Sequence, residues 1–203
     1  MAGDTSRAAH HGNRHRRSAE ARRAVLEATD DLLVERGFAG LTIEGIAARA
    51  GVAKQTIYRW WPSKTEILMD AFTDDAAQHL TPPDSGDLGE DLRRHLRNLA
   101  EFLTTSDAGA VFRALAGQAQ HDPEVATRLR TDHLGKQRER DRLPLRRALD
   151  RGELPPDTDI DFLVDELVGP IYYRVLVTGE PVPQEFTDRL VAHVLRRPPV
   201  ATP

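Results

Sequence analysis

The sequence contains no cysteine, and only 5% of its residues are aromatic. Without cysteine, the chain cannot form a disulfide, a zinc finger or a thiolate nucleophile, which excludes thiol chemistry. No apolar run approaches the roughly 18 residues that cross a membrane, and residues 1–17 lack the apolar core of a secretion signal. We therefore expect a cytoplasmic protein without a membrane partner.

The sequence also lacks the short motifs that carry much of enzyme chemistry. It has no GxSxG, GxGxxG, P-loop or HExxH pattern. Its eight histidines are scattered. The closest set, His10, His11 and His15, lies in the N-terminal segment and gives little support to a metal-binding hypothesis. We therefore predict that the protein is not an enzyme, holds no metal and carries no cofactor.

Apolar residues make up 39% of the 203 positions, enough for a core in one domain or in a small domain joined to a larger one. The net charge of −4 is uneven, because residues 1–70 carry +2 and the remainder carries −6. Between Arg7 and Arg23 there are six arginines and one acid, Glu20. A basic segment on an acidic chain suggests a polyanionic partner, and a solvated, disordered segment is the alternative.

The first 80 residues contain four helix signals. Apolar residues at helical spacing predict a first helix over residues 18–37, which ends in glycine. Thr42 supplies the N-cap of a second helix of about two turns, and a third covers residues 54–60. A capping box formed by Ser63 and Glu66 opens the fourth. Short helices separated by a glycine-containing turn, after a longer helix, are typical of a helix-turn-helix.

The third predicted helix has the two faces that a major-groove helix needs. Ile57 and Trp61 are four residues apart and can pack inward, while the other side is small, polar and basic. Lysine and arginine bind guanine or phosphate, glutamine binds adenine, and threonine offers a methyl group to thymine. We therefore expect this helix to contact DNA.

The segment from Phe38 to Leu68 resembles the N-terminal domain of the TetR family of bacterial transcriptional regulators, through its run G-V-x-x-x-T-x-Y-x-x-[FW]-x-S-K-x-x-[IL]-[LM]. The resemblance implies an all-α homodimer whose first three helices bind DNA and whose fourth leads to a helical domain with a small-molecule pocket. By position it assigns DNA contacts to Thr42, Lys54, Gln55, Thr56, Tyr58, Arg59 and Lys64. Two positions depart from the pattern: Ala53 stands where a Ser or Thr cap is common, and Trp61 stands where phenylalanine is usual.

The expected roles of these residues differ. We expect Gln55 and Arg59 to read bases, and Tyr58 and Lys64 to contact phosphates, which orient a protein without reading sequence. Trp60 either packs beside the first helix or lies against the DNA backbone. Ahead of the first helix, a flexible basic arm with Arg14, Arg16 and Arg17 can reach into the minor groove or lie along phosphates, unless it is merely disordered.

The predicted domain organisation has four parts and about nine helices. Residues 1–17 form the flexible basic arm, 18–64 the helix-turn-helix domain, 65–197 a helical regulatory and dimerisation domain with a connecting helix over 65–80, and 198–203 a disordered tail. Within the regulatory domain, Pro144 is expected to kink or break its helix.

Two features of the regulatory domain suggest function. The last two helices, between Asp159 and Leu195, carry broad apolar faces that suit pairing with a second copy, although they could instead complete the core of one chain. Candidate pocket residues are Phe102, Phe112, Gln118, Tyr172 and Tyr173, for which ordinary core packing is the alternative.

Together these features predict a sequence-specific transcriptional regulator. We expect a ligand-responsive repressor that binds a pseudopalindromic double-stranded DNA operator as a homodimer, with an unidentified small-molecule effector. The alternative is a helical small-molecule-binding or scaffold protein whose helix-turn-helix is not used on DNA.

Overall fold

A computed structural model describes the backbone of residues 5–196 and the side chains of residues 16–73, 76 and 79–196. Over this range, the regular secondary structure is helical throughout, with no strand. The helices form nine continuous segments there, because α7, a π-helical turn and α8 follow one another directly. The prediction of an all-α protein is confirmed. None of the described helices is long and apolar enough to cross a membrane. The chain divides into two compact units, with the division after Ala71.

Unit 1 contains α1 (Thr5–Gly40), α2 (Ile43–Ala50), α3 (Lys54–Trp60) and the first half of α4 (Lys64–His79). Helix α1 begins at Thr5, well before the expected start of the first helix at residue 18. No proline interrupts residues 5–36, and alanine and arginine, which favour helices, are frequent there. At Gly37 the backbone leaves helical geometry with a φ of 66°.

Local capping sets the limits of the short helices in unit 1. The Thr42 hydroxyl accepts a hydrogen bond from the Gly45 amide at 3.1 Å, as expected of an N-cap. Gly51 ends α2 with a φ of 68°, in the left-handed region that favours glycine. Ala53 precedes α3 without a side-chain cap, and Trp61 ends it in an extended conformation.

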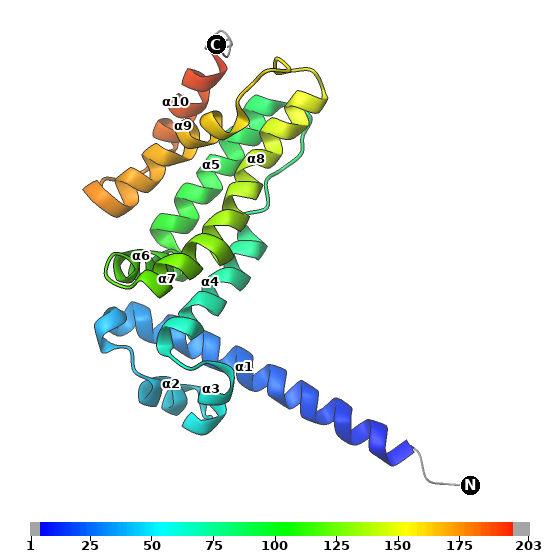
Figure 1. The fold of residues 1–203 in the computed structure, drawn as a ribbon, viewed down its shortest axis with the longest axis vertical. Helices are drawn as coiled ribbons and strands as arrows, with labels where there is room; N and C mark the ends of the chain where they lie inside the picture. Colours follow the sequence, from blue (N-terminus) through cyan, green and yellow to red (C-terminus); the bar gives the residue numbers. More distant parts are fainter. Residues whose placement is uncertain (1–4, 197–203) are drawn as a thin grey trace. The chain divides into compact units, whose positions relative to one another are not determined.

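Unit 2 contains the rest of α4 and all later elements (Figure 1). These are α5 (Leu88–Thr105), α6 (Asp107–Ala119), α7 (Pro123–Arg128), a π-helical turn (Leu129–Leu134), α8 (Gly135–Asp150), α9 (Ile160–Tyr173), a second π-helical turn (Arg174–Thr178) and α10 (Gln184–Leu195). Helix α5 packs against α6, α8 and α10, and α8 packs against α9. The apolar side of α5, with Leu92, Leu96, Leu99 and Leu103, is buried and forms the centre of the core.

Helix α8 passes through Pro144 and continues to Asp150, so of the two expected outcomes, a kink or a break, the break is wrong. The residues after the proline are held by burial, because Leu145 and Ala148 are fully buried. The residues before it are held by ion pairs to α9, among them Arg142 with Asp161. These contacts compensate for the backbone hydrogen bond that proline cannot make.

Candidate DNA-binding interface

Helix α3 separates an exposed polar side from a buried apolar one. Lys54, Gln55, Tyr58 and Arg59 are exposed, and Thr56 is partly exposed. Ile57 is fully buried and Trp61 retains only 2% of its exposure. The expectation that these two apolar residues pack inward is confirmed. Packing therefore anchors the helix and leaves its hydrogen-bonding side chains at the surface, where a ligand can reach them.

The ammonium group of Lys54 contacts an acid on the neighbouring helix. Its Nζ donates to Oε1 of Glu44, in the first turn of α2, at 2.9 Å. This hydrogen bond holds the pKa of Glu44 below its ordinary value and raises the pKa of Lys54. Both side chains are more than half exposed, so water screens the pair. A phosphate group can therefore compete with Glu44 for this lysine.

Lys64 makes hydrogen bonds within the protein that its sequence motif does not indicate. Its Nζ donates to the backbone carbonyl oxygens of Phe38 at 2.8 Å and of Leu41 at 3.0 Å, and it lies 4.2 Å from the centroid of the Phe38 ring. These carbonyl groups are at the corner between α1 and α2. In the free protein, the ammonium group thus joins the start of α4 to this corner.

A second connection joins the end of α3 to α1 and α4. The carboxylate oxygen Oδ2 of Asp70 accepts hydrogen bonds from Nε1 of Trp61 and from Nη2 of Arg22, both at 2.6 Å. The guanidinium of Arg22 also lies 5.3 Å from the centroid of the Trp61 ring. Sequence reasoning missed this cluster, because its members are 9 and 48 residues apart. The only local signal was a tryptophan, which carries an N–H donor, where the family usually has phenylalanine.

The remaining residues expected to contact DNA lie at the end of α3 and on α1. Trp60 packs edge to face on Trp61, with 5.5 Å between ring centroids, and the guanidinium of Arg59 lies 5.4 Å from the Trp60 ring. Arg16 forms an exposed ion pair with Glu20 on α1, and Arg17 is exposed. The side chain of Arg14 is outside the described residues.

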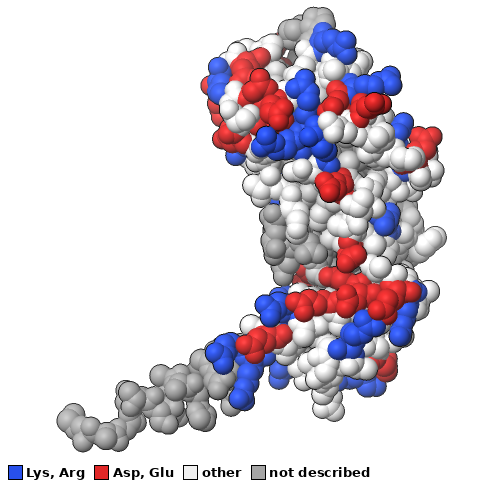
Figure 2. Space-filling view, turned by 180° about the vertical axis from the view of Figure 1, so that it is seen from behind, with Lys and Arg blue, Asp and Glu red and all other residues white. Residues whose placement is uncertain are grey.

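Acidic and basic side chains lie side by side on the face of the molecule that Figure 2 shows. In unit 1 this reflects ion pairs such as Arg49 with Glu35, which joins α2 to α1 at 2.7 Å. Such pairs offset part of the positive charge of unit 1, so a DNA-binding face there would depend on individual exposed cations.

Three of the five predicted pocket residues come together in unit 2. Phe102 and Phe112 are buried, and their ring centroids lie 6.0 and 5.4 Å from that of Phe72 on α4. Tyr172 lies 5.7 Å from Phe112, and burial raises the pKa of its hydroxyl. Gln118 is half-buried on α6. The fifth residue, Tyr173, is 58% exposed.

Buried polar pairs in unit 2 were not predicted. His95 Nε2 lies 2.8 Å from Oδ1 of Asp141, which also accepts a hydrogen bond from Nε2 of Gln137 at 2.8 Å. Close to Phe72, the His133 ring contacts the Thr73 hydroxyl at 2.9 Å. The two histidine contacts join residues 46 and 60 positions apart, so no local pattern reveals them.

Comparison with known families identifies the chain. The family model for bacterial regulatory proteins of the tetR family matches residues 25–71. A second family model, for the tetracyclin repressor-like C-terminal domain, matches residues 82–194. The chain belongs to the TetR family. Members of this family are DNA-binding transcription factors, generally dimeric, and are not enzymes. The predictions of a helix-turn-helix regulator and of a non-enzyme are thus confirmed.

Individual TetR-family proteins match over most of their length. The uncharacterized HTH-type transcriptional regulator YdeS of Bacillus subtilis is 38% identical over 174 residues, 86% of this chain and 87% of YdeS. The DNA-binding transcriptional repressor TetR of Mycobacteroides abscessus is 30% identical over 85% of this chain and 90% of its own. The crystal structure of the TetR family transcription regulator SCO0332, also 38% identical, has a TM-score of 0.74 and covers 87% of this chain and 97% of that one.

Proposed function

We propose that this TetR-family regulator is a ligand-responsive repressor that binds a pseudopalindromic operator as a homodimer in the cytoplasm. The observation that carries the DNA-binding part is the division of α3 into an exposed polar side and a side anchored by Ile57 and Trp61. The proposed DNA contacts are Thr42, Lys54, Gln55, Thr56, Tyr58, Arg59 and Lys64. Repression is supported by the name of the relative from Mycobacteroides abscessus.

The roles of these contacts follow from their chemistry and exposure. Gln55 and Arg59 are exposed and have the hydrogen-bonding groups that read base edges, whereas the Tyr58 hydroxyl suits phosphate. The hydroxyl of Thr42 accepts from Gly45 and retains its own proton for a phosphate oxygen. We also propose that Arg16 and Arg17, exposed on α1, lie along the phosphate backbone; Arg14 belongs to the same proposal.

Selection of bound fragments from a random DNA pool with the purified protein tests this function. A dimer with two recognition helices should enrich two inverted half-sites whose centres are about 10 base pairs, or a multiple of that, apart. A pool that shows no enriched sequence after repeated rounds would contradict sequence-specific binding. An enriched sequence with a single half-site would contradict binding as a dimer.

The dimer is proposed to form through α9, the following π-helical turn and α10. Of the seven large hydrophobic residues that are exposed in the described part of the chain, five belong to this segment: Phe162, Tyr173, Leu176, Val177 and Leu195. Exposed apolar side chains concentrated in one segment support an interface between copies. The alternative, that these faces only complete the core of one chain, leaves their exposure unexplained.

The effector is proposed to bind at the aromatic cluster of Phe102, Phe112 and Tyr172 around Phe72. Helix α4 connects this cluster to the DNA-binding unit. Its residue Asp70 accepts a hydrogen bond from Trp61 at the end of α3 and is two residues before Phe72. An effector that binds better to one position of α4 would change the spacing of the two recognition helices in the dimer. Tyr173, which is mostly exposed, and Gln118 are not needed for this proposal.

Substitution of Glu44 by glutamine tests the role of Lys54. The change removes the partner of Lys54 and a negative charge from the proposed DNA side. We expect about twofold to fivefold tighter binding to operator and to unrelated DNA alike, because phosphate contacts are not sequence-specific. Fluorescence anisotropy with both DNAs measures this. The control is Glu124→Gln, an exposed acid in the first turn of α7. Weaker binding by Glu44→Gln would contradict the prediction.

Substitution of Lys64 by methionine separates a phosphate contact from a purely structural role. Loss of the hydrogen bonds to Phe38 and Leu41 should lower the melting temperature in either case. If Lys64 also contacts phosphate, the slope of log affinity against log salt should fall by about 0.9, which we expect. Lys136→Met, an exposed lysine in unit 2, is the control. A lower melting temperature with an unchanged slope would restrict Lys64 to the fold.

A further inference from the structure

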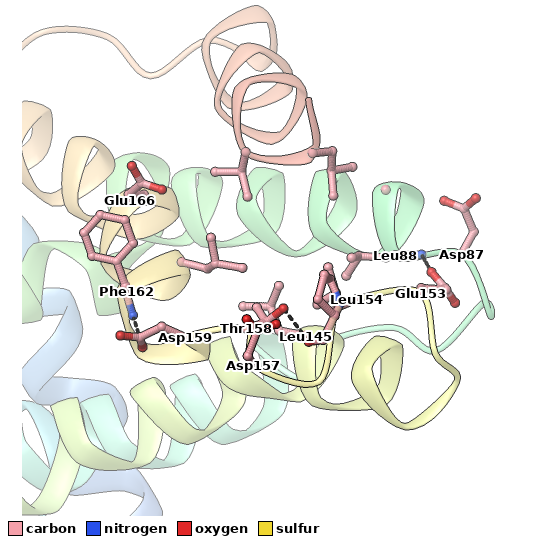
Figure 3. A pocket seen from close by; sticks show the side chains of 15 residues that line it. Asp87, Leu88, Leu145, Glu153, Leu154, Asp157, Thr158, Asp159, Phe162 and Glu166 are labelled. Atoms are coloured by element: carbon pink, nitrogen blue, oxygen red, sulfur yellow. Dashed lines mark hydrogen bonds between the residues drawn. The ribbon is translucent and has the colours of Figure 1, made fainter. Parts of the chain in front are cut away.

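Unit 2 has a cavity that contains none of the predicted pocket residues. It measures about 410 Å³ and lies between the start of α5, the end of α8, the loop that follows α8, and the facing parts of α9 and α10 (Figure 3). This volume is within the range of sites that bind small molecules. Its floor is apolar, because Leu88, Leu145 and Val194 are buried. A ligand with an apolar part can therefore replace water there.

The charged side chains that line the cavity are all acidic. Five carboxylates line it, and the described residues that line it include no lysine, arginine or histidine. In Figure 3, Asp159 and Glu166 lie at one end with Phe162, and Asp87 and Glu153 lie at the other end, next to Leu88. Asp157 lies between the two groups. A cation inside the cavity would thus be near negative charge at both ends.

The fold itself holds several of these carboxylates in place. Asp87 accepts a hydrogen bond from the Glu90 amide and caps α5, and Asp159 accepts one from the Phe162 amide and caps α9. Glu153 accepts one from the Leu88 amide at 3.3 Å and pairs with Arg151, which offsets part of its charge. The exposed Asp157 and the half-buried Glu166 have neither capping role. These two acids can therefore be changed without removing a helix cap.

The type of cation follows from the spacing of the acids and from the apolar floor. In the described part of the chain, no three histidine or acidic side chains converge closely enough to hold a metal ion. The carboxylates instead surround an apolar space, with the ring of Phe162, 52% exposed, at its edge. Aromatic faces attract organic ammonium groups, which are large and weakly hydrated. The charge and the lining thus fit an organic cation with an apolar group better than a metal ion.

We propose that this cavity binds an amphipathic organic cation, with its ammonium group near Phe162, Asp157 and Glu166 and its apolar part on Leu88, Leu145 and Val194. The site is separate from the effector cluster at Phe72, and the proposal goes beyond the proposed function. It does not depend on binding to DNA, so either proposal can fail while the other holds.

Isothermal titration calorimetry of the whole protein without DNA tests the proposal. The probe is benzyltrimethylammonium, compared with N,N-dimethylbenzamide, which is neutral and of similar size, and with benzoate, which is an anion. We expect binding of the cation only, and weaker binding as salt is raised. No binding of the cation, or equal binding of the neutral amide, would overturn the proposal.

Variants locate the binding site. Asp157→Asn combined with Glu166→Gln should weaken cation binding about fivefold, because each partly exposed ion pair contributes modestly. Phe162→Leu keeps an apolar side chain without the aromatic face and should weaken it about threefold. Asp150→Asn, which changes an exposed acid outside the cavity, is the matched control. Circular dichroism establishes that each variant is folded. Unchanged affinity in the double variant, or an equal loss in the control, would place the cation elsewhere.

A further measurement examines the alternative occupant of the cavity, a second copy of the chain. Phe162 and Leu195 line the cavity and also belong to the proposed dimer segment. Sedimentation velocity with and without the cation shows whether the bound form is a dimer. We expect the dimer to bind the cation and to remain a dimer. Dissociation into monomers on binding would mean that a second copy occupies the mouth of the cavity, and it would contradict binding of the cation to the dimer.

Discussion

Replacement of both Leu176 and Val177 by glutamate is expected to convert the proposed dimer into monomers and to weaken operator binding by about 100-fold or more. The two wild-type side chains are 42% and 69% exposed in the single chain, in the turn that follows α9. In the proposed dimer they are buried against the second copy. Two carboxylates without partners in such an interface would require a desolvation free energy that the interface cannot offset.

The loss of operator affinity follows from the loss of linkage between the two DNA-binding units. In a dimer, binding of one recognition helix places the second near its half-site at a high effective concentration, which raises overall affinity without any new contact. A monomer keeps only the affinity for one half-site. Binding of the variant to an isolated half-site should therefore equal that of the wild type, whereas binding to the full operator should fall.

Sedimentation velocity and fluorescence anisotropy measure the two effects. Val34→Glu is the matched control for association, because Val34 is 56% exposed but lies on α1 in unit 1. It should leave the dimer intact. A double variant that still sediments as a dimer would contradict an interface made by α9, the π-helical turn and α10. A variant that is monomeric but binds the full operator normally would contradict binding as a dimer.

Local features of the fold could be predicted from the sequence because they depend on neighbouring residues. Thr42 caps α2 as expected, since a threonine hydroxyl can reach the amide three residues later. Ile57 and Trp61 are buried as expected, since residues four apart share one face of a helix.

Features that depend on distant residues could not be predicted. Pro144 stays inside α8 because contacts from α9 and the core hold the helix on both sides of it, and these partners come from elsewhere in the chain. Lys64 was predicted from its motif as a phosphate contact, yet its hydrogen bonds to Phe38 and Leu41 became visible only in the folded unit. The sequence pattern starts the first helix at residue 18, because the dense charge ahead of it suggests disorder, but arginine favours helix and α1 begins at Thr5.

The cluster of Asp70, Trp61 and Arg22 leads to the second prediction of large effect. Asp70→Ala removes the acceptor of two hydrogen bonds and leaves the Trp61 N–H buried without its partner. A buried donor that loses its partner costs about 1–3 kcal/mol. The Arg22 ion pair, whose side chains are 43% and 37% exposed, adds at most about 1 kcal/mol. We expect the free energy of unfolding of unit 1 to fall by about 1–4 kcal/mol.

Trp61→Phe identifies the interaction responsible, because it keeps an aromatic ring in the core and removes the N–H donor. In this background no indole donor remains to be left without a partner, so Asp70→Ala should cost about 1–2 kcal/mol less than in the wild type. Urea unfolding followed by tryptophan fluorescence reports on unit 1, because both tryptophans, Trp60 and Trp61, belong to it, and Trp60 remains in every variant. Asp31→Ala, which removes an exposed partner of Arg49, is the control and should cost less than about 0.5 kcal/mol.

Operator binding tests whether the cluster of Asp70, Trp61 and Arg22 couples α4 to the recognition helix. Asp70 and Phe72 are on the same helix, with Asp70 holding the end of α3 and Phe72 contacting the proposed effector cluster. If Asp70 transmits the state of α4 to the recognition helix, Asp70→Ala should weaken operator binding even where unit 1 is still folded, at low temperature and without urea. Trp61→Phe should weaken it less, since Asp70 keeps Arg22 as a partner. Two results together would contradict a coupling role. The first is that the losses in unfolding free energy of Asp70→Ala and Trp61→Phe add in the double variant, and the second is that each folded single variant binds the operator normally.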